Sequence, residues 1–138
     1  MADNKKTTQQ IKKAVQLFVQ ERDWEKFHTP KNLSMSLAIE TSELMEIFQW
    51  LTTEEASLNQ LTENQKDRIE EEIADISIYL FDLCNVLNID ISRAIENKLK
   101  INRTKYPIKF AKGNAEKYTA YRGTKNAKRN TRTDKSKL

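Results

Sequence analysis

The scarcity of glycine limits what this chain can fold into. Its 138 residues contain two glycines, Gly113 and Gly123, so residues 1–112 contain none. Tight β-hairpin turns usually need glycine, asparagine or aspartate in backbone conformations with positive φ. The two prolines, Pro30 and Pro107, are also few and far apart. We therefore expect an all-α body and not a β-rich one.

Apolar residues recur at helical spacing in four segments, and each segment predicts an amphipathic helix. The helices are expected to end near residues 23, 51, 88 and 104. Capping motifs predict the starts of the second helix, the third helix and a short helix connecting them: Thr29-Pro30, Thr62-x-x-Gln65 and Thr52-x-x-Glu55. The third helix is expected to bury Ile69, Ile73, Ile76, Leu80, Leu83 and Leu87, and the fourth Ile91, Ala94, Ile95, Leu99 and Ile101.

Composition indicates a single-domain cytoplasmic protein with a basic tail. The one cysteine, Cys84, excludes an intrachain disulfide and is expected to be a small core residue. We find no signal peptide and no apolar run approaching the roughly 20 residues of a membrane span, so no membrane partner is expected. The net charge of the whole chain is +4, and residues 113–138 alone carry +6. Residues 1–112 therefore carry a net charge of −2. We expect 1–112 to be the folded domain and 113–138 a disordered tail.

Two acidic pairs stand at the same spacing in two of the predicted helices. Glu40 and Glu43 are three residues apart in the second helix, and Glu72 and Asp75 repeat this spacing in the third. Positions i and i+3 lie on one face of a helix, about one turn apart. If the two helices pack antiparallel, the four carboxylates converge.

Acids at this spacing are common on solvated helix faces, and either pair alone would be interpreted that way. Here Glu40 interrupts the apolar stripe between Leu37 and Leu44, and Glu72 and Asp75 line the edge of the next stripe. A cluster of four carboxylates persists only with bound cations or raised pKa values. Oxygen ligands favour Mg²⁺, or Mn²⁺, over Zn²⁺, and Mg²⁺ held by carboxylates usually meets substrate phosphates. The pairs therefore predict a Mg²⁺ site for cleavage of a nucleoside triphosphate.

Further motifs flank the acidic pairs in a fixed order. They are Glu21-Arg22-Asp23-Trp24-Glu25-Lys26-Phe27-His28, Glu40-Thr41-Ser42-Glu43, Phe48-Gln49-Trp50, Glu72-Ile73-Ala74-Asp75, Ile78-Tyr79-Leu80, and Lys98 through Asn102-Arg103 to Tyr106-Pro107. Together they resemble the all-α MazG-like nucleotide pyrophosphohydrolases, and within them the dCTP pyrophosphatase branch. The resemblance extends over residues 18–117. It implies a MazG-like bundle of four main helices, completed by oligomerisation into a dimer or tetramer.

The resemblance also implies an activity: hydrolysis of a (deoxy)nucleoside triphosphate, such as dCTP, to the monophosphate and pyrophosphate by a metal-activated water. The implied catalytic residues and metal ligands are Glu40, Glu43, Glu72 and Asp75. The implied substrate contacts are Trp24, His28, Trp50, Tyr79, Lys98 and Asn102. Indole rings stack on bases, and a lysine is a compact partner for phosphate. The two tryptophans would thus enclose the base, while Lys98 and Asn102 would meet phosphate or sugar.

Two other hypotheses stay open on the residues alone. Tyr118 and Tyr121 lie among the Lys/Arg of the tail, which would suit a nucleic-acid-binding helical protein. Such segments more often only solubilise a protein, so nucleic acid is not the expected partner. The acids would face solvent if the chain were a purely structural helical oligomer.

Overall fold

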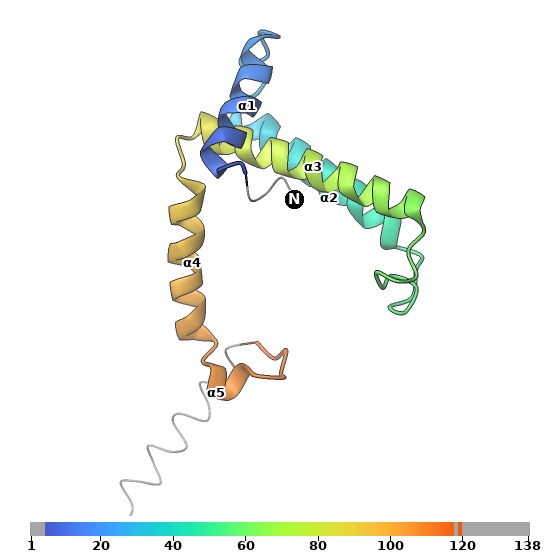
Figure 1. Ribbon diagram of the computed structural model, residues 1–138. Coiled ribbons are helices and arrows are strands. Elements are labelled where there is room, and N and C mark those ends of the chain that lie inside the picture. The colour runs from blue at the N-terminus through green and yellow to red at the C-terminus, as the bar shows by residue number, and fades with distance from the viewer. Residues whose placement is uncertain (1–4, 118, 120–138) are drawn as a thin grey trace, which may run out of the picture. The chain divides into compact units, whose positions relative to one another are not determined.

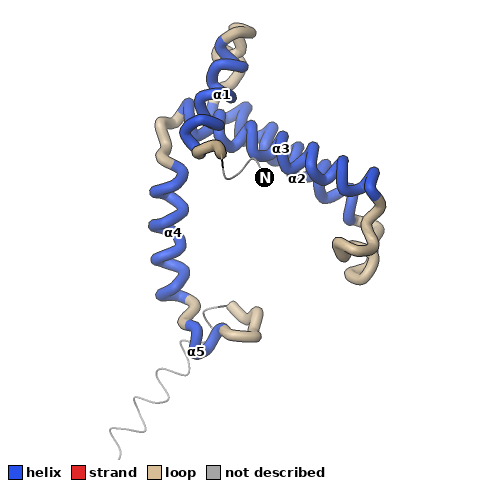
Figure 2. Tube along the Cα trace, in the orientation of Figure 1, coloured by secondary structure: helices blue, strands red, loops and turns tan. Residues whose placement is uncertain are grey.

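All regular secondary structure is helical in the residues that a computed structural model of the chain describes, 5–117 and 119 (Figure 1, Figure 2). The helices are α1 (Thr8–Gln20), α2 (Pro30–Phe48), α3 (Glu63–Val86), α4 (Ile91–Lys105) and the short α5 (Ile108–Ala111). The expected all-α body with four main helices is confirmed. Among these helices, none combines the length and the apolar character that crossing a membrane requires.

Threonine side chains fix where the helices begin. Thr29 accepts a hydrogen bond from the backbone N–H of Asn32, and Pro30 occupies the first turn of α2. Thr62 and Gln65 form a reciprocal capping box at the start of α3. These side chains satisfy N–H groups that have no partner within the helix, which is why both starts were predictable from sequence.

The expectation of a short helix starting at Thr52-x-x-Glu55 is wrong. Both capping hydrogen bonds form, with Thr52 N–H donating to Glu55 Oε2 at 2.8 Å and Glu55 N–H donating to Thr52 Oγ1 at 3.2 Å. The segment nevertheless continues as turns and not as a helix. Nucleating a helix is costly, and no long apolar stripe follows here to offset that cost. The segment 49–62 is therefore a loop between α2 and α3.

Asn88 ends α3 slightly earlier than its apolar pattern predicts. Its φ of 51° lies in the left-handed region, which asparagine tolerates better than most residues. Asn88 N–H donates to the Asn85 carbonyl at 3.1 Å, and Ile89 N–H donates to the Cys84 carbonyl at 2.8 Å. This paired pattern satisfies two of the last carbonyls and stops the helix.

The chain divides into two units, residues 1–91 and residues 92–138. In the first, α2 packs along α3, and α1 packs against α3 (Figure 1). The second contains α5 and all of α4 after its first residue. The boundary between a folded domain (1–112) and a tail (113–138) stays a prediction, because most of that tail lies outside the described residues. Nucleic-acid binding through Tyr118 and Tyr121 falls outside them as well.

The buried apolar residues of the first unit come from all three of its helices: Val15, Val19, Leu33, Ile47 and Cys84. The prediction that Cys84 belongs to the core is confirmed. The expectation of a long buried stripe on α3 is wrong, because none of its six residues is fully buried. Ile73 is 51% exposed and Leu87 is also exposed, and the others are half-buried: Ile69, Ile76, Leu80 and Leu83. On α4 the expectation is wrong, because that helix has no buried residue. An apolar stripe indicates that another element covers that face of a helix. Within this chain, α1 and α2 pack on only part of the surface of α3.

Leu33 is the residue whose truncation we expect to cost most stability, since it is 1% exposed in the chain. Leu33→Ala should lower the free energy of unfolding by roughly 2–5 kcal/mol through lost burial and a residual cavity. Urea denaturation followed by circular dichroism at 222 nm measures this. Leu58→Ala, at a position 74% exposed, is the matched control and should change it by less than about 0.5 kcal/mol. Equal losses in the two variants would contradict this account of the core.

Candidate metal centre

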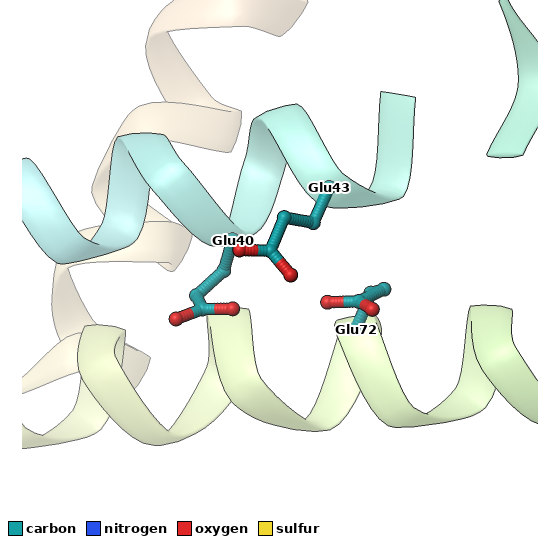
Figure 3. Close-up of side chains that lie close together, drawn as sticks. All are labelled: Glu40, Glu43 and Glu72. Atoms are coloured by element: carbon teal, nitrogen blue, oxygen red, sulfur yellow. The ribbon is translucent and has the colours of Figure 1, made fainter. Parts of the chain in front are cut away.

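Three glutamates converge between α2 and α3. Glu40 and Glu43 extend from α2 and Glu72 from α3, and each offers one carboxylate oxygen such that the three atoms lie within 4.8 Å of one another. In Figure 3 the three side chains enter the space between the two helices and point toward each other. The one-turn spacing on α2 and the packing of α2 along α3 produce this arrangement.

Asp75, the fourth predicted acid, is outside this group of three but close enough to affect it. The pKa of Glu40 is raised above its usual value of 4.5, first by desolvation and then by the negative charges of Glu43, Asp75 and Glu72. The pKa of Glu72 is also raised, first by desolvation and then by Glu43 and Asp75, while Arg68 opposes the shift. The four acids therefore form one electrostatic unit with an excess of negative charge.

The chemistry of this group fits a hard divalent cation. All the donors are carboxylate oxygens, which Mg²⁺ and Mn²⁺ accept and which Zn²⁺ uses less readily than nitrogen or sulfur. Ligands at about 2.1 Å from one ion lie at most about 4.2 Å apart. The observed limit of 4.8 Å exceeds this only slightly, so small side-chain rotations would let Glu40, Glu43 and Glu72 share one ion.

A tight turn after α1 places two further predicted residues. Asp23 has a φ of 53°, in the left-handed region, which turns the chain back on the helix end. Trp24 N–H then donates to the Val19 carbonyl, and His28 N–H donates to the Trp24 carbonyl, each at 3.1 Å. This geometry brings Trp24 and His28 to the same side of the turn.

Trp24, His28 and Tyr79 form a row of rings. The ring centroids of Trp24 and His28 are 5.8 Å apart, and those of His28 and Tyr79 are 6.5 Å apart. Tyr79 follows Asp75 by four residues on α3, so it lies one turn along the same face. Three of the predicted substrate contacts thus lie close together.

Asp82 pairs with the histidine of this row and was not predicted as a site residue from the sequence. Its Oδ2 lies 2.6 Å from His28 Nδ1, and the residue is 4% exposed. His28 and Asp82 also line a pocket of about 410 Å³. A signal was present in the sequence, because Asp82 is the only charged residue between positions 76 and 89. It also continues the helical line of Glu72, Asp75 and Tyr79.

The other predicted contacts lie elsewhere. Trp50 follows the end of α2 and is 86% exposed, outside the row of rings in the described part of the chain. Lys98 and Asn102 share one face of α4, which belongs to the second unit. The roles of these three residues stay predictions.

Comparison with known proteins places this arrangement in a family. The model of the MazG-like family matches residues 35–120, a range that contains all four acids. This chain belongs to the MazG-like family.

Relatives of this MazG-like chain carry a common name. It is similar to dCTP pyrophosphatase 1 of Rattus norvegicus, with 38% identity over 113 residues that cover 82% of this chain and 66% of the rat protein. The Homo sapiens protein of the same name is 37% identical over the same shares of the two chains. The MazG-like chain thus spans about two thirds of the length of these relatives. The predicted resemblance to the dCTP pyrophosphatase branch is confirmed.

A solved structure supports the fold of the MazG-like chain. The crystal structure of a pyrophosphatase from Archaeoglobus fulgidus matches it with a TM-score of 0.64 and 44% identity. The match covers 69% of this chain and 87% of the archaeal one. The helical architecture predicted from the sequence is therefore shared with a solved structure.

We expect Glu40→Gln to raise the melting temperature of the metal-free protein at pH 7. The raised pKa of Glu40 means that, above about pH 4.5, the folded protein binds more protons than the unfolded chain. Stability therefore falls as pH rises from there through the raised pKa, and a neutral amide removes this loss. The gain should be a few degrees at most, because solvent screens partly exposed charges.

Thermal unfolding in EDTA at pH 4 and pH 7, followed by circular dichroism, measures this effect. Glu70→Gln removes an exposed charge from α3 outside the cluster and is the control. The gain from Glu40→Gln should be larger at pH 7 than at pH 4. A gain that is the same at both pH values, or one that Glu70→Gln reproduces, would argue against repulsion within the cluster.

Proposed function

We propose that this chain hydrolyses (deoxy)nucleoside triphosphates to the monophosphate and pyrophosphate, with Mg²⁺ as cofactor and dCTP or a related cytosine nucleotide as substrate. The observation that carries the proposal is the approach of Glu40, Glu43 and Glu72 to within 4.8 Å between two helices. Membership of the MazG-like family and relatives named dCTP pyrophosphatase 1 support it. Mn²⁺ would fit the same oxygen ligands.

The acidic residues and the rings would divide the work. Glu40, Glu43 and Glu72 would hold the cation, and Asp75 would be a fourth ligand or a nearby negative charge that strengthens binding. Mg²⁺, when bound, supplies charge neutralisation at the phosphates and lowers the pKa of a coordinated water. The attacking group would be this water and not a side chain of the protein. The products would be a nucleoside monophosphate and pyrophosphate.

The base would lie near the row of rings. Trp24 offers a flat indole face, and Tyr79 connects the row to the acidic cluster along α3. Trp50, exposed after α2, would cover the base from another side, and Lys98 and Asn102 would contact phosphate or sugar. These three roles rest on the resemblance of the motifs. A cytoplasmic location remains part of the proposal, and the free thiol of Cys84 fits a reducing compartment.

We also propose that the active form is a homo-oligomer, a dimer or a tetramer. Exposed apolar side chains stand one turn apart on two helices, Met35 with Ile39 on α2 and Ile95 with Leu99 on α4. Exposed apolar side chains that gather on a helix face are typical of surfaces that contact another protein. A second copy of the chain would cover it and complete the bundle.

Light scattering coupled to size-exclusion chromatography tests the homo-oligomer. We expect a mass of two or four chains at micromolar concentration, because the apolar faces of α2 and α4 leave water on association. Ile95→Glu should shift the mass toward the monomer, while Leu58→Glu, in the loop, should not. A wild-type chain that is monomeric throughout would contradict this part of the proposal.

A panel of nucleotides tests the activity. Purified protein is incubated with Mg²⁺ and dCTP, 5-methyl-dCTP, dUTP and the other dNTPs, and the products are separated by ion exchange. Monophosphate and pyrophosphate in equal amounts are expected, with cytosine nucleotides the best substrates. If no nucleotide in the panel gives these products, the proposed function is wrong.

Substitution of single acids tests the metal ligands. Glu43→Gln and Glu72→Gln should each lower kcat/KM by at least about 100-fold. Mutating a residue that only hydrogen-bonds to a metal ligand already lowers metal affinity or activity by about 10–100-fold, and these two residues would be ligands themselves. Glu40→Gln and Asp75→Asn should also lower it. Glu70→Gln is the matched control and should stay close to wild type. Full activity in Glu43→Gln and Glu72→Gln, with helicity retained, would overturn the metal assignment.

A further inference from the structure

A buried aspartate faces the predicted base-contacting histidine. Asp82 is 4% exposed on α3, and its Oδ2 lies 2.6 Å from Nδ1 of His28, whose side chain is 19% exposed. Burying a carboxylate is costly unless it is paired and hydrogen-bonded. His28 is that partner, so the pair has to form for Asp82 to be accommodated. Neither the acidic cluster nor the proposed cleavage chemistry uses Asp82.

We propose that Asp82 is a positioning residue for base selection: it fixes His28 with its proton on Nδ1, so that Nε2 accepts a hydrogen bond from an amino-bearing base. The proposal rests on the proposed function, and it names the residue that sets the preference of that site. Asp82 itself would act through His28 and not through the reacting phosphates.

The direction of the hydrogen bond follows from the chemistry of the two groups. An ionised carboxylate can only accept, so with Asp82 ionised the proposal places the proton between His28 and Asp82 on Nδ1. In a neutral imidazole the other nitrogen then carries a lone pair and is an acceptor. Nε2 is therefore the atom of His28 that remains for a ligand.

The surroundings of His28 suit a planar ligand with an amino group. His28 and Asp82 line the pocket of about 410 Å³, within the range of small-molecule sites. Val19 and Val86 supply apolar walls, and Glu25 adds another acceptor. The ring centroids of Trp24 and Tyr79 lie 5.8 Å and 6.5 Å from that of His28.

This arrangement discriminates between bases that differ in one group. Cytosine carries an amino group at the position where uracil carries a carbonyl oxygen. An acceptor at Nε2 forms a hydrogen bond with the amino group and faces the carbonyl lone pairs unfavourably. A site built to hydrogen-bond one substrate group rejects the analogue that lacks it far more strongly than a site that only fits its shape.

The tautomer of His28 can be measured directly in the chain of 138 residues. His28 is the only histidine in the sequence, so a long-range ¹H–¹⁵N spectrum of the imidazole reports this residue alone. At a pH where the ring is neutral, we expect the proton on Nδ1. In Asp82→Asn, a side chain that both donates and accepts, the Nε2–H form should become populated. A wild-type ring protonated on Nε2 would overturn the proposal, even if the variant failed to fold.

The second measurement is the ratio of kcat/KM for dCTP to that for dUTP. Asp82→Asn should lower this ratio by roughly 10-fold or more, chiefly through KM for dCTP, because the acceptor is no longer fixed. Asp67→Asn, on an exposed position of the same helix, is the matched control and should keep the wild-type ratio. A purely structural role for Asp82 would lower both rates together and leave the ratio unchanged, which would overturn the proposal.

The two failures can be told apart. A wild-type protein that cleaves neither nucleotide removes the proposed function and, with it, the selectivity assigned to Asp82. A wild-type protein that prefers dCTP, together with an Asp82→Asn variant of unchanged ratio, removes only the role of Asp82.

Discussion

The packing of α2 along α3 forces like charges together, and the candidate site depends on this contact. Glu40 and Glu43 come from one helix and Glu72 from the other, and they meet only because the helices pack closely. Desolvation and mutual repulsion raise the pKa values of Glu40 and Glu72, so the arrangement is unfavourable without a counterion. Burial of residues such as Leu33 and Ile47 has to offset it. A cation would find its ligands already assembled, which lowers the cost of organising them on binding.

The third helix sets the distance between the two halves of the site. Glu72, Asp75, Tyr79 and Asp82 follow one another at helical intervals along α3. Ten residues separate the first from the last, which corresponds to about 15 Å along the helix axis. The acidic cluster lies at one end of this line and the His28–Asp82 pair at the other. A rigid helix would thus keep the proposed cation site and the proposed base pocket at a constant separation.

Local patterns explain what the sequence could predict. The caps at Thr29 and Thr62 depend on neighbours a few residues away, and so does the convergence of acids spaced by one turn. The contact of His28 with Asp82 joins residues 54 positions apart, and no periodicity reports such a pair. The apolar stripe of α4 was also misjudged, because a stripe indicates that a surface is covered without saying whether the same chain covers it. The prediction of a short helix within the loop 49–62 was wrong for another reason, because its capping hydrogen bonds form without a helix following them.

The acidic cluster is contained in one contiguous segment, from Glu40 to Asp75, whereas the row of rings also draws on the turn after α1. Substitutions in that turn would therefore alter which base is accepted without disturbing the ligands of the cation. The proposed base preference can therefore change independently of the proposed metal ligands. Asp23, whose φ lies in the left-handed region, directs the chain into that turn and so sets where Trp24 and His28 stand without contributing to the acidic cluster.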